Sequence, residues 1–272
     1  MVTQITPDRD ETAAELTGCV EAALQHARKA GADAAEASAS SQFGLSVNVR
    51  LGEVETLEHH QDRGLGVTVY LGQRKGHASS ADLRPDSIAE CVRRALDIAR
   101  FTEEDRCNGL ADPDRLATEF PDLDLWHPQP LAVNAAIERA IRCETAGRAD
   151  ARITNSEGAG VNTHAGVAVY GNTNGFLGVS SGTRFEQSCV LVAGEGERMQ
   201  RDYWYDSRRA YEDLEDAGET GRIAAQRTVD RLGARKVATG QFPVVFAAPV
   251  ARGLVGHLIS AVSGGSLYRN AS

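Results

Sequence analysis

The sequence predicts an α+β protein in two parts: an N-terminal helix–antiparallel meander–helix domain (residues 1–130) and the beginning of a sheet-rich C-terminal domain (residues 131–272). Two observations predict this class. In the first part, apolar residues recur at helical spacing on either side of a group of short strand-like runs, which are joined by glycine-containing turns. The second part repeats this layout of a sheet flanked by helices. Strands that are grouped in the chain, rather than alternating singly with helices, are typical of α+β proteins.

The first part begins with an amphipathic helix over residues 10–30, which Gly31 ends. Weakly alternating alanines predict a half-buried strand over residues 33–42. Connections that contain Gly52 and Gly64 predict hairpins between the strands that follow. Those strands are expected at residues 45–51, 54–60 and 65–71, with 76–80 as an additional strand. The next helix is expected at residues 86–100.

The second part is reached through residues 101–130, whose prolines and aspartates predict an irregular connector. A helix over residues 132–146 opens this part, and a charged helix over residues 211–232 follows its sheet. The sheet strands are expected at residues 152–159, 161–170, 175–181, 183–193 and 199–205. A buried strand at 243–248 and a helix at 250–262 complete the predicted elements.

Charge and cysteine content exclude several classes of protein. The net charge of −9 argues against an electrostatic grip on nucleic acid or on an anionic membrane surface. The five cysteines are scattered and form no CxxC pair, so the sequence favours neither a disulfide framework nor a zinc knuckle. No apolar run has the length of a membrane span, and the first residues are acidic where a signal peptide is basic. We therefore expect a cytoplasmic protein.

Histidines in two places invite a metal interpretation. His257 lies on the predicted helix 250–262, but that helix carries no second histidine and no carboxylate. A catalytic zinc takes three protein ligands, so this helix cannot form a zinc site by itself. His59 and His60 are neighbours on a strand and should point to opposite faces, which argues against a shared ion.

The segment MQRDYWY, residues 199–205, is the strongest candidate for peptide binding. Arg201, Tyr203, Trp204 and Tyr205 would line a groove for an extended peptide in one interpretation. In the other interpretation, which is slightly favoured, the aromatic side chains pack the sheet against a helix.

Several segments together resemble the PmbA (TldE) branch of the TldD/PmbA family, also called modulator of DNA gyrase. The resemblance is carried by ARKAGADAAEASAS, LSVNVRLGEVETLEHHQDRGLGVTVYLGQRKGHASSADL, DARITNSEGAGVNTHAGVAVYGNTNGFLG, MQRDYWY and VARGLVGHLISAVSGGSLYR. It implies a cytosolic protein with an N-terminal α+β domain and a sheet-rich C-terminal domain. It also implies pairing with a TldD-type subunit to form a protease for extended, unfolded peptides.

The resemblance places the HExxxH zinc motif of the TldD branch on residues 252–257. Only the last histidine, His257, is present; Arg252 stands at the first ligand and Gly253 at the general base. The resemblance therefore implies no zinc in this chain and a zinc ion in the TldD-type partner. Family chains continue beyond SGGSLYR, so the sequence resembles a truncated PmbA-type chain or a fragment.

Three functions remain open from the sequence. The preferred one is a non-catalytic PmbA-type subunit that pairs with a TldD-type metalloprotease and helps to hold an unfolded peptide, with no nucleic acid or membrane partner. The second is a metallopeptidase that acts alone. The third is a non-enzymatic protein that binds DNA gyrase, as the older family name suggests.

Overall fold

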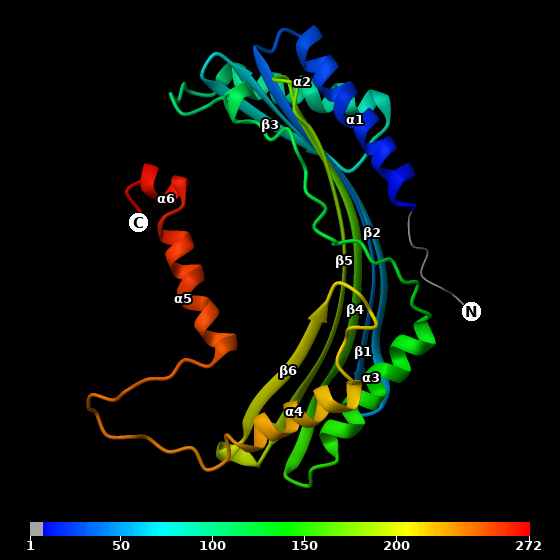
Figure 1. Cartoon of the computed structure of the whole chain (residues 1–272), viewed down its shortest axis with the longest axis vertical. Coiled ribbons are helices and arrows are strands. Elements are labelled where there is room, and N and C mark those ends of the chain that lie inside the picture. The colour runs from blue at the N-terminus through cyan, green and yellow to red at the C-terminus, as the bar shows by residue number, and fades with distance from the viewer. Residues whose placement is uncertain (1–7) are drawn as a thin grey trace. The chain divides into compact units, whose positions relative to one another are not determined.

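The computed structural model describes residues 8–272, which divide into two compact units, up to Gly233 and from Ala234 onward (Figure 1). The first unit contains six strands and four α-helices. In chain order they are α1 (Arg9–Lys29), β1 (Ala34–Arg50), β2 (Glu53–Leu71), β3 (Arg74–Ser80), α2 (Pro85–Phe101), α3 (Val133–Arg148), β4 (Ile153–Asn172), β5 (Leu177–Ala193), β6 (Gln200–Arg208) and α4 (Ala217–Val229). Short 3-10 turns lie at Pro113–Arg115 and Gly196–Arg198. The α+β class is confirmed.

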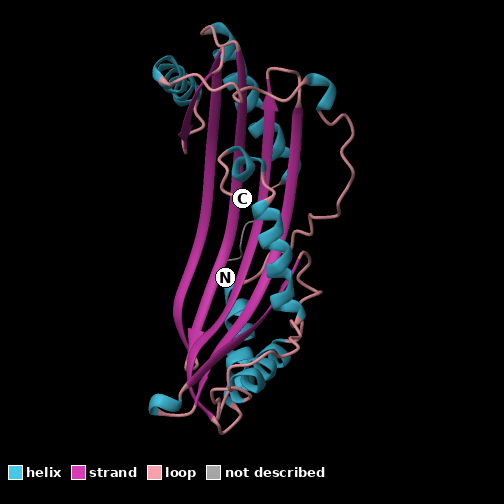
Figure 2. Ribbon diagram, turned by 90° about the vertical axis from the view of Figure 1, so that its left-hand side faces the viewer, coloured by secondary structure: helices cyan, strands magenta, loops and turns pink. Residues whose placement is uncertain are grey.

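All six strands form one antiparallel sheet in the order β3-β2-β1-β4-β5-β6, whose long strands run side by side in Figure 2. The centre of the sheet is the pairing of β1 with β4, from Glu36 opposite Asn172 to Val49 opposite Ala159. Strands on either side of the expected boundary at residue 130 therefore share one sheet. The sequence did not indicate this shared sheet. The division into domains at 130/131 stays a prediction.

The strands are longer than expected, because several predicted turns lie inside continuous strands. The hairpin expected at residues 62–64 is wrong: Gly64 pairs with Ser40 in the middle of β2. Glycine inside a strand can make room for a close neighbour as well as for a turn. At Gly66, for example, an added Cβ would lie 3.4 Å from the Ser38 hydroxyl oxygen. In the same way, the expected strands of each half merge pairwise into β1, β2, β4 and β5.

The hairpin between β1 and β2 is confirmed. Leu51 and Gly52 form its two-residue turn with φ of 54° and 84°. Positive φ at both central residues is what the tight hairpin turn of the I′ type requires, and glycine adopts it without steric cost.

The four α-helices of the first unit cover one face of the sheet, which is the convex face in Figure 1. In β1 the odd-numbered side chains, apart from the half-buried Phe43, are buried against these helices, as the two-residue period of a strand requires. Helices α1 and α2 form one core with alanines of β1 and valines of β2 and β4. Helices α3 and α4 form a second core over the opposite end of β1, β4 and β5.

Helix α4 begins at Ala217, later than the expected start at residue 211. Asp216 is its N-cap, and the Asp216 side chain accepts a hydrogen bond from the backbone N–H of Glu219. Because this cap satisfies a free N–H group of the first turn, the helix starts there rather than at Tyr211.

The second unit contains α5 (Ala248–Ala261) and α6 (Gly264–Tyr268). Helix α5 confirms the expected helix, with Pro249 in its first turn. The strand expected at 243–248 is wrong: residues 243–247 are irregular, Ala248 begins α5, and Val245 is 94% exposed. A strand needs a hydrogen-bonded neighbour, and none pairs with this segment among residues 8–272.

None of the helices in the described part of the chain is long and apolar enough to cross a membrane. The first seven residues of the acidic segment that was compared with a signal peptide lie outside the described residues.

Candidate functional site

The concave face of the sheet carries no helix of the described residues up to Gly233, and its side chains are mostly polar. On β1 this face is formed by the even-numbered residues Glu36, Ser38, Ser40, Gln42, Ser46 and Asn48. The antiparallel register brings the even-numbered residues of β2, β4 and β5 to the same side. We call this surface the open face.

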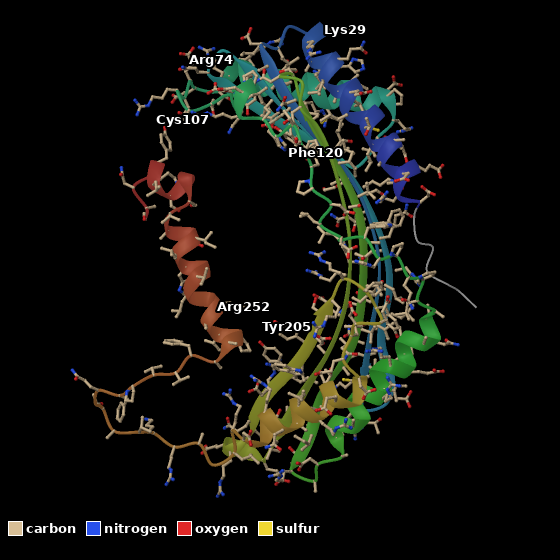
Figure 3. All side chains as sticks on the ribbon, viewed as in Figure 1. Lys29, Arg74, Cys107, Phe120, Tyr205 and Arg252 are labelled. Atoms are coloured by element: carbon tan, nitrogen blue, oxygen red, sulfur yellow. The ribbon has the colours of Figure 1, made fainter. Side chains whose placement is uncertain are left out.

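Strand β6 divides the predicted aromatic groove between the two faces. Trp204 pairs with the buried Cys189 and, partly buried, packs against the core under α3 and α4. The Arg227 guanidinium lies 5.3 Å from the centroid of the Trp204 ring. Tyr203 and Tyr205 lie on the open face with ring centroids 6.2 Å apart, and Figure 3 shows Tyr205 on the concave side.

Arg201 completes the open-face part of this segment. Its guanidinium forms an ion pair with Glu157 at 2.7 Å. The packing interpretation therefore applies to Trp204, while Arg201, Tyr203 and Tyr205 remain accessible. Their role in binding a peptide stays a prediction.

A row of polar residues crosses the middle of the open face. His60 on β2 pairs with Gly44 on β1, Gly44 pairs with His164 on β4, and His164 pairs with Arg184 on β5. A pocket of about 190 Å³ lies here and is lined by Ser46, His60, Asn162, Thr163, His164, Arg184 and Glu186. We call it the histidine pocket.

The histidine pocket was not found from the sequence. His60 was compared only with its chain neighbour His59, whereas the structure places it near His164, more than 100 positions away. His59 pairs with the buried Leu45 and so lies on the other face, which confirms the opposite directions of the two neighbours. The sequence did contain one signal of this pocket, which is the glycine Gly44. Gly44 is the one residue of this row without a side chain.

The electrostatics of the histidine pocket are positive. The pKa of His164 is lowered by burial and then by the positive charges of Arg184, His60 and Arg209. Glu186 opposes this lowering, but its carboxylate already pairs with Arg184 at 3.1 Å and accepts a hydrogen bond from Ser207 at 3.1 Å. One carboxylate that already has partners thus faces several nitrogen donors.

A second polar cluster of the open face is centred on Glu36. The Tyr70 hydroxyl donates to one carboxylate oxygen at 2.9 Å, and the Tyr170 hydroxyl donates to the other at 2.6 Å. Burial, followed by this hydrogen bond, raises the pKa of both tyrosines. The cluster joins β2, β1 and β4 and holds two aromatic rings on the open face.

Two profiles of one protein family match the chain. The PmbA/TldA metallopeptidase domain 1 matches residues 35–99, and the PmbA/TldA metallopeptidase central domain matches residues 126–232. Together these ranges contain all six strands and the helices α2, α3 and α4, apart from the first residue of β1 and the last residues of α2. The chain belongs to the PmbA/TldA metallopeptidase family.

Members of the PmbA/TldA family are similar along most of this chain. Metalloprotease PmbA of Escherichia coli O157:H7 is 48% identical over 241 residues, which are 88% of this chain and 54% of that protein. The PmbA homolog of Haemophilus influenzae is 42% identical over 259 residues, which are 95% of this chain and 57% of that protein. The chain therefore spans about half the length of these curated relatives.

Solved structures of similar fold agree with this assignment. A Bacteroides thetaiotaomicron protein, described as a candidate modulator of DNA gyrase, superposes with a TM-score of 0.86 at 27% identity, over 93% of this chain and 58% of that one. TldE of Thermococcus kodakarensis shares the fold, with a TM-score of 0.64 at 16% identity over 77% of this chain and 47% of that one.

Helix α5 does not carry the set of side chains that binds the catalytic metal ion of a metallopeptidase. His257 is exposed on this helix, and Arg252 and Gly253 occupy the positions where the resemblance places a ligand and a base. Within residues 8–272 no three His, Cys, Asp or Glu side chains lie together in a way that could hold a metal ion. The residues present do not fit a catalytic zinc, which takes three protein ligands.

Proposed function

We propose that this chain is a PmbA/TldE-type subunit of a heteromeric zinc metalloprotease and acts in the cytoplasm. In this proposal it is not catalytic itself, and a TldD-type partner carries the zinc. The observation that carries the proposal is the set of metal-binding side chains on α5. This helix offers only His257, whereas the catalytic zinc of a metallopeptidase takes three protein ligands. The similarity to PmbA proteins and the TldE-like fold support it.

The substrate in this proposal is an unfolded, extended peptide, and two features of the sheet support it. Residues 53–64 of β2 pair with β1 on one side, and β3 pairs with β2 only from Leu65 onward. That segment therefore has an unpaired edge among the described residues. An unpaired edge can add a peptide strand through backbone hydrogen bonds, which tolerate many sequences.

The charge of this edge sets a preference. Glu53, Glu55, Glu58 and Asp62 lie along residues 53–64, and all four are exposed. A peptide strand with basic residues would meet opposite charges there, whereas an acidic strand would be repelled.

The proposal is tested by mixing. A fluorescent, unfolded peptide is incubated with this chain, with a purified TldD-type protein, and with both together. We expect cleavage that is sensitive to a chelator only when the TldD-type protein is present, and faster cleavage with both. Chelator-sensitive cleavage by this chain alone, free of any partner, would contradict the proposal and favour a metallopeptidase that acts alone.

The gyrase alternative is kept because one relative of similar fold is described as a candidate modulator of DNA gyrase. With a net charge of −9, the more plausible route is contact with the gyrase protein rather than with DNA. Affinity capture with this chain that recovers gyrase and no TldD-type protein would favour the alternative.

A further inference from the structure

The histidine pocket contains side chains that the fold itself does not use. Neither ring of His60 and His164 forms a hydrogen bond within residues 8–272, and the same holds for the side chains of Ser46 and Asn162. The cluster draws on three strands, because Ser46 belongs to β1, His60 to β2, and Asn162 and His164 to β4. Polar donors from three strands thus converge on one pocket without a partner in the fold.

Glycines make room for the two imidazole rings. A Cβ at Gly44 would collide with the ring of His60 and with the backbone carbonyl of Thr163. A Cβ at Gly166 would lie 3.1 Å from Nε2 of His164. Glycine inside a strand weakens the sheet unless a close approach requires it. Here the close approach is that of the two histidine rings to the backbone.

The charge of the pocket favours an anion over a metal ion. Arg184 lines the pocket beside His164, and the positive charges of Arg184 and Arg209 act to lower the pKa of His164. A divalent cation would meet the same repulsion. The single nearby carboxylate, Glu186, is already paired with Arg184. An anion, in contrast, would accept hydrogen bonds from imidazole, amide, hydroxyl and guanidinium groups.

We propose that the histidine pocket binds a carboxylate group of an extended peptide that lies on the open face. This inference rests on the proposed function, because it assigns a recognition site for the peptide of that proposal. A carboxylate fits better than a phosphate, since Glu186 would repel a doubly charged anion more strongly than a singly charged one. The carboxylate is either the C-terminus of the peptide or an acidic side chain.

Binding should be coupled to proton uptake. The charged groups that face His164 are His60 from β2, Arg184 and Glu186 from β5, and Arg209 after β6; β1 contributes only the uncharged Gly44 and Ser46. A bound carboxylate adds a negative charge and raises the pKa of His164 from its lowered value. The affinity therefore increases as the pH falls through the pKa of the bound state.

The test measures fluorescence anisotropy of a labelled, unfolded octapeptide with the full chain. The probes are a peptide with a free C-terminus and no acidic side chain, the same peptide amidated, and an amidated peptide with one internal glutamate. We expect the better of the two carboxylate-bearing peptides to bind about tenfold more tightly than the amidated peptide without a carboxylate at about pH 6. The peptide that shows this advantage identifies the source of the carboxylate.

Substitutions in the pocket separate its role from general folding effects. His164→Phe and His60→Phe should each remove most of the tenfold preference, while His164→Gln should keep a donor and lose the pH dependence. His59→Phe is the matched control, because His59 is exposed on the same strand but lies on the other face. Circular dichroism identifies any variant that does not fold.

The inference is overturned if all three peptides bind equally, if no peptide binds, or if His60→Phe behaves like His59→Phe. These results leave the mixing experiment untouched, so the proposed subunit function is tested separately. The inference stands if the carboxylate preference is present in the unmodified chain and is lost with the two pocket histidines.

Discussion

The carboxylate of Glu144 on α3 accepts a hydrogen bond from the backbone N–H of Gly52, in the turn between β1 and β2, at 2.8 Å. Its other oxygen accepts from the N–H of Leu51, also at 2.8 Å. Glu144 is 1% exposed, so a charge is buried where the backbone groups of a tight turn need acceptors. A helix from one half of the chain thus fixes a hairpin from the other half.

Glu144→Ala is expected to lower the free energy of unfolding by about 3 kcal/mol. The substitution removes two hydrogen bonds to a charged acceptor and leaves two backbone donors without a partner. Glu144→Gln keeps one acceptor oxygen and should lose about half as much. Urea unfolding measures the change, and Glu138→Ala on the exposed side of α3 is the control, with an expected change within about 0.5 kcal/mol. Equal effects at both positions would contradict this role of Glu144.

Gly221→Ala is expected to destabilise the contact between α3 and α4 by roughly 1–3 kcal/mol. An added Cβ would collide with the carbonyl oxygen of Cys143 and lie 2.9 Å from the backbone nitrogen of Gly147. Gly18→Ala is the matched control in α1, because nothing lies within 4 Å of its added Cβ. Since alanine favours a helix, this control should gain about 0.5–1 kcal/mol. Thermal unfolding of the two variants should therefore shift in opposite directions.

The helices were easier to predict than the strands, for a physical reason. Helix α2 was located within two residues because the helical period of its apolar residues is a local signal. The continuity of β2 through Gly64 depends on pairing with β1, which local sequence does not encode. For the same reason the segment around Val245 was mistaken for a strand: β-branched residues favour strands only where a neighbour pairs with them.

The candidate site shows the same limit. The direction of His59 and His60 followed from the period of a strand, but the pairing of His60 with Gly44, and of Gly44 with His164, follows from sheet register. Register depends on strand bounds, and these were wrong by up to half a strand. The segment 199–205 was placed correctly as a strand, yet which of its aromatic residues faced the core depended on Trp204 pairing with Cys189.

Glu36→Gln is expected to lower the pH at which Tyr70 and Tyr170 ionise. Both hydroxyls donate to Glu36, and this bond contributes to the raised pKa of each. The folded pKa lies above the unfolded value of about 10, so the stability that this cluster contributes is complete below about pH 10 and is lost as the pH rises through the folded pKa. Ultraviolet absorbance of phenolate measures the shift. Glu21→Gln, an exposed change of the same charge on α1, should leave the curve unchanged.

The purified chain is expected to hold less than one tightly bound zinc ion, and His257→Ala should not change its metal content. The reason is that α5 provides one imidazole and no carboxylate, whereas a bound zinc needs more ligands. Elemental analysis after dialysis gives the answer directly. About one zinc per chain, lost on substitution of His257, would contradict the prediction. It would show that residues outside α5 supply the other zinc ligands.

Trypsin is expected to cleave first at Arg235 or Lys236 and to leave a resistant fragment that ends close to Gly233. Both residues are exposed in a segment without helix or strand, where local opening costs little free energy. Arg115 also lies in an irregular connector, but that connector is tied to β5: the N–H of Thr183 donates to the Leu125 carbonyl at 2.8 Å, and the N–H of His127 donates to the Thr183 hydroxyl at 3.0 Å.

Mass spectrometry of the fragments over time checks this order. Replacing Arg235 and Lys236 with glutamine should delay the first cut without protecting Arg115. A fragment that ends near residue 115 should not accumulate early, because β1 pairs with β4 along most of its length and separation of the halves would break the central pairing of the sheet. Early release of such a fragment would show instead that the first 115 residues are held to the rest more weakly than their shared sheet implies.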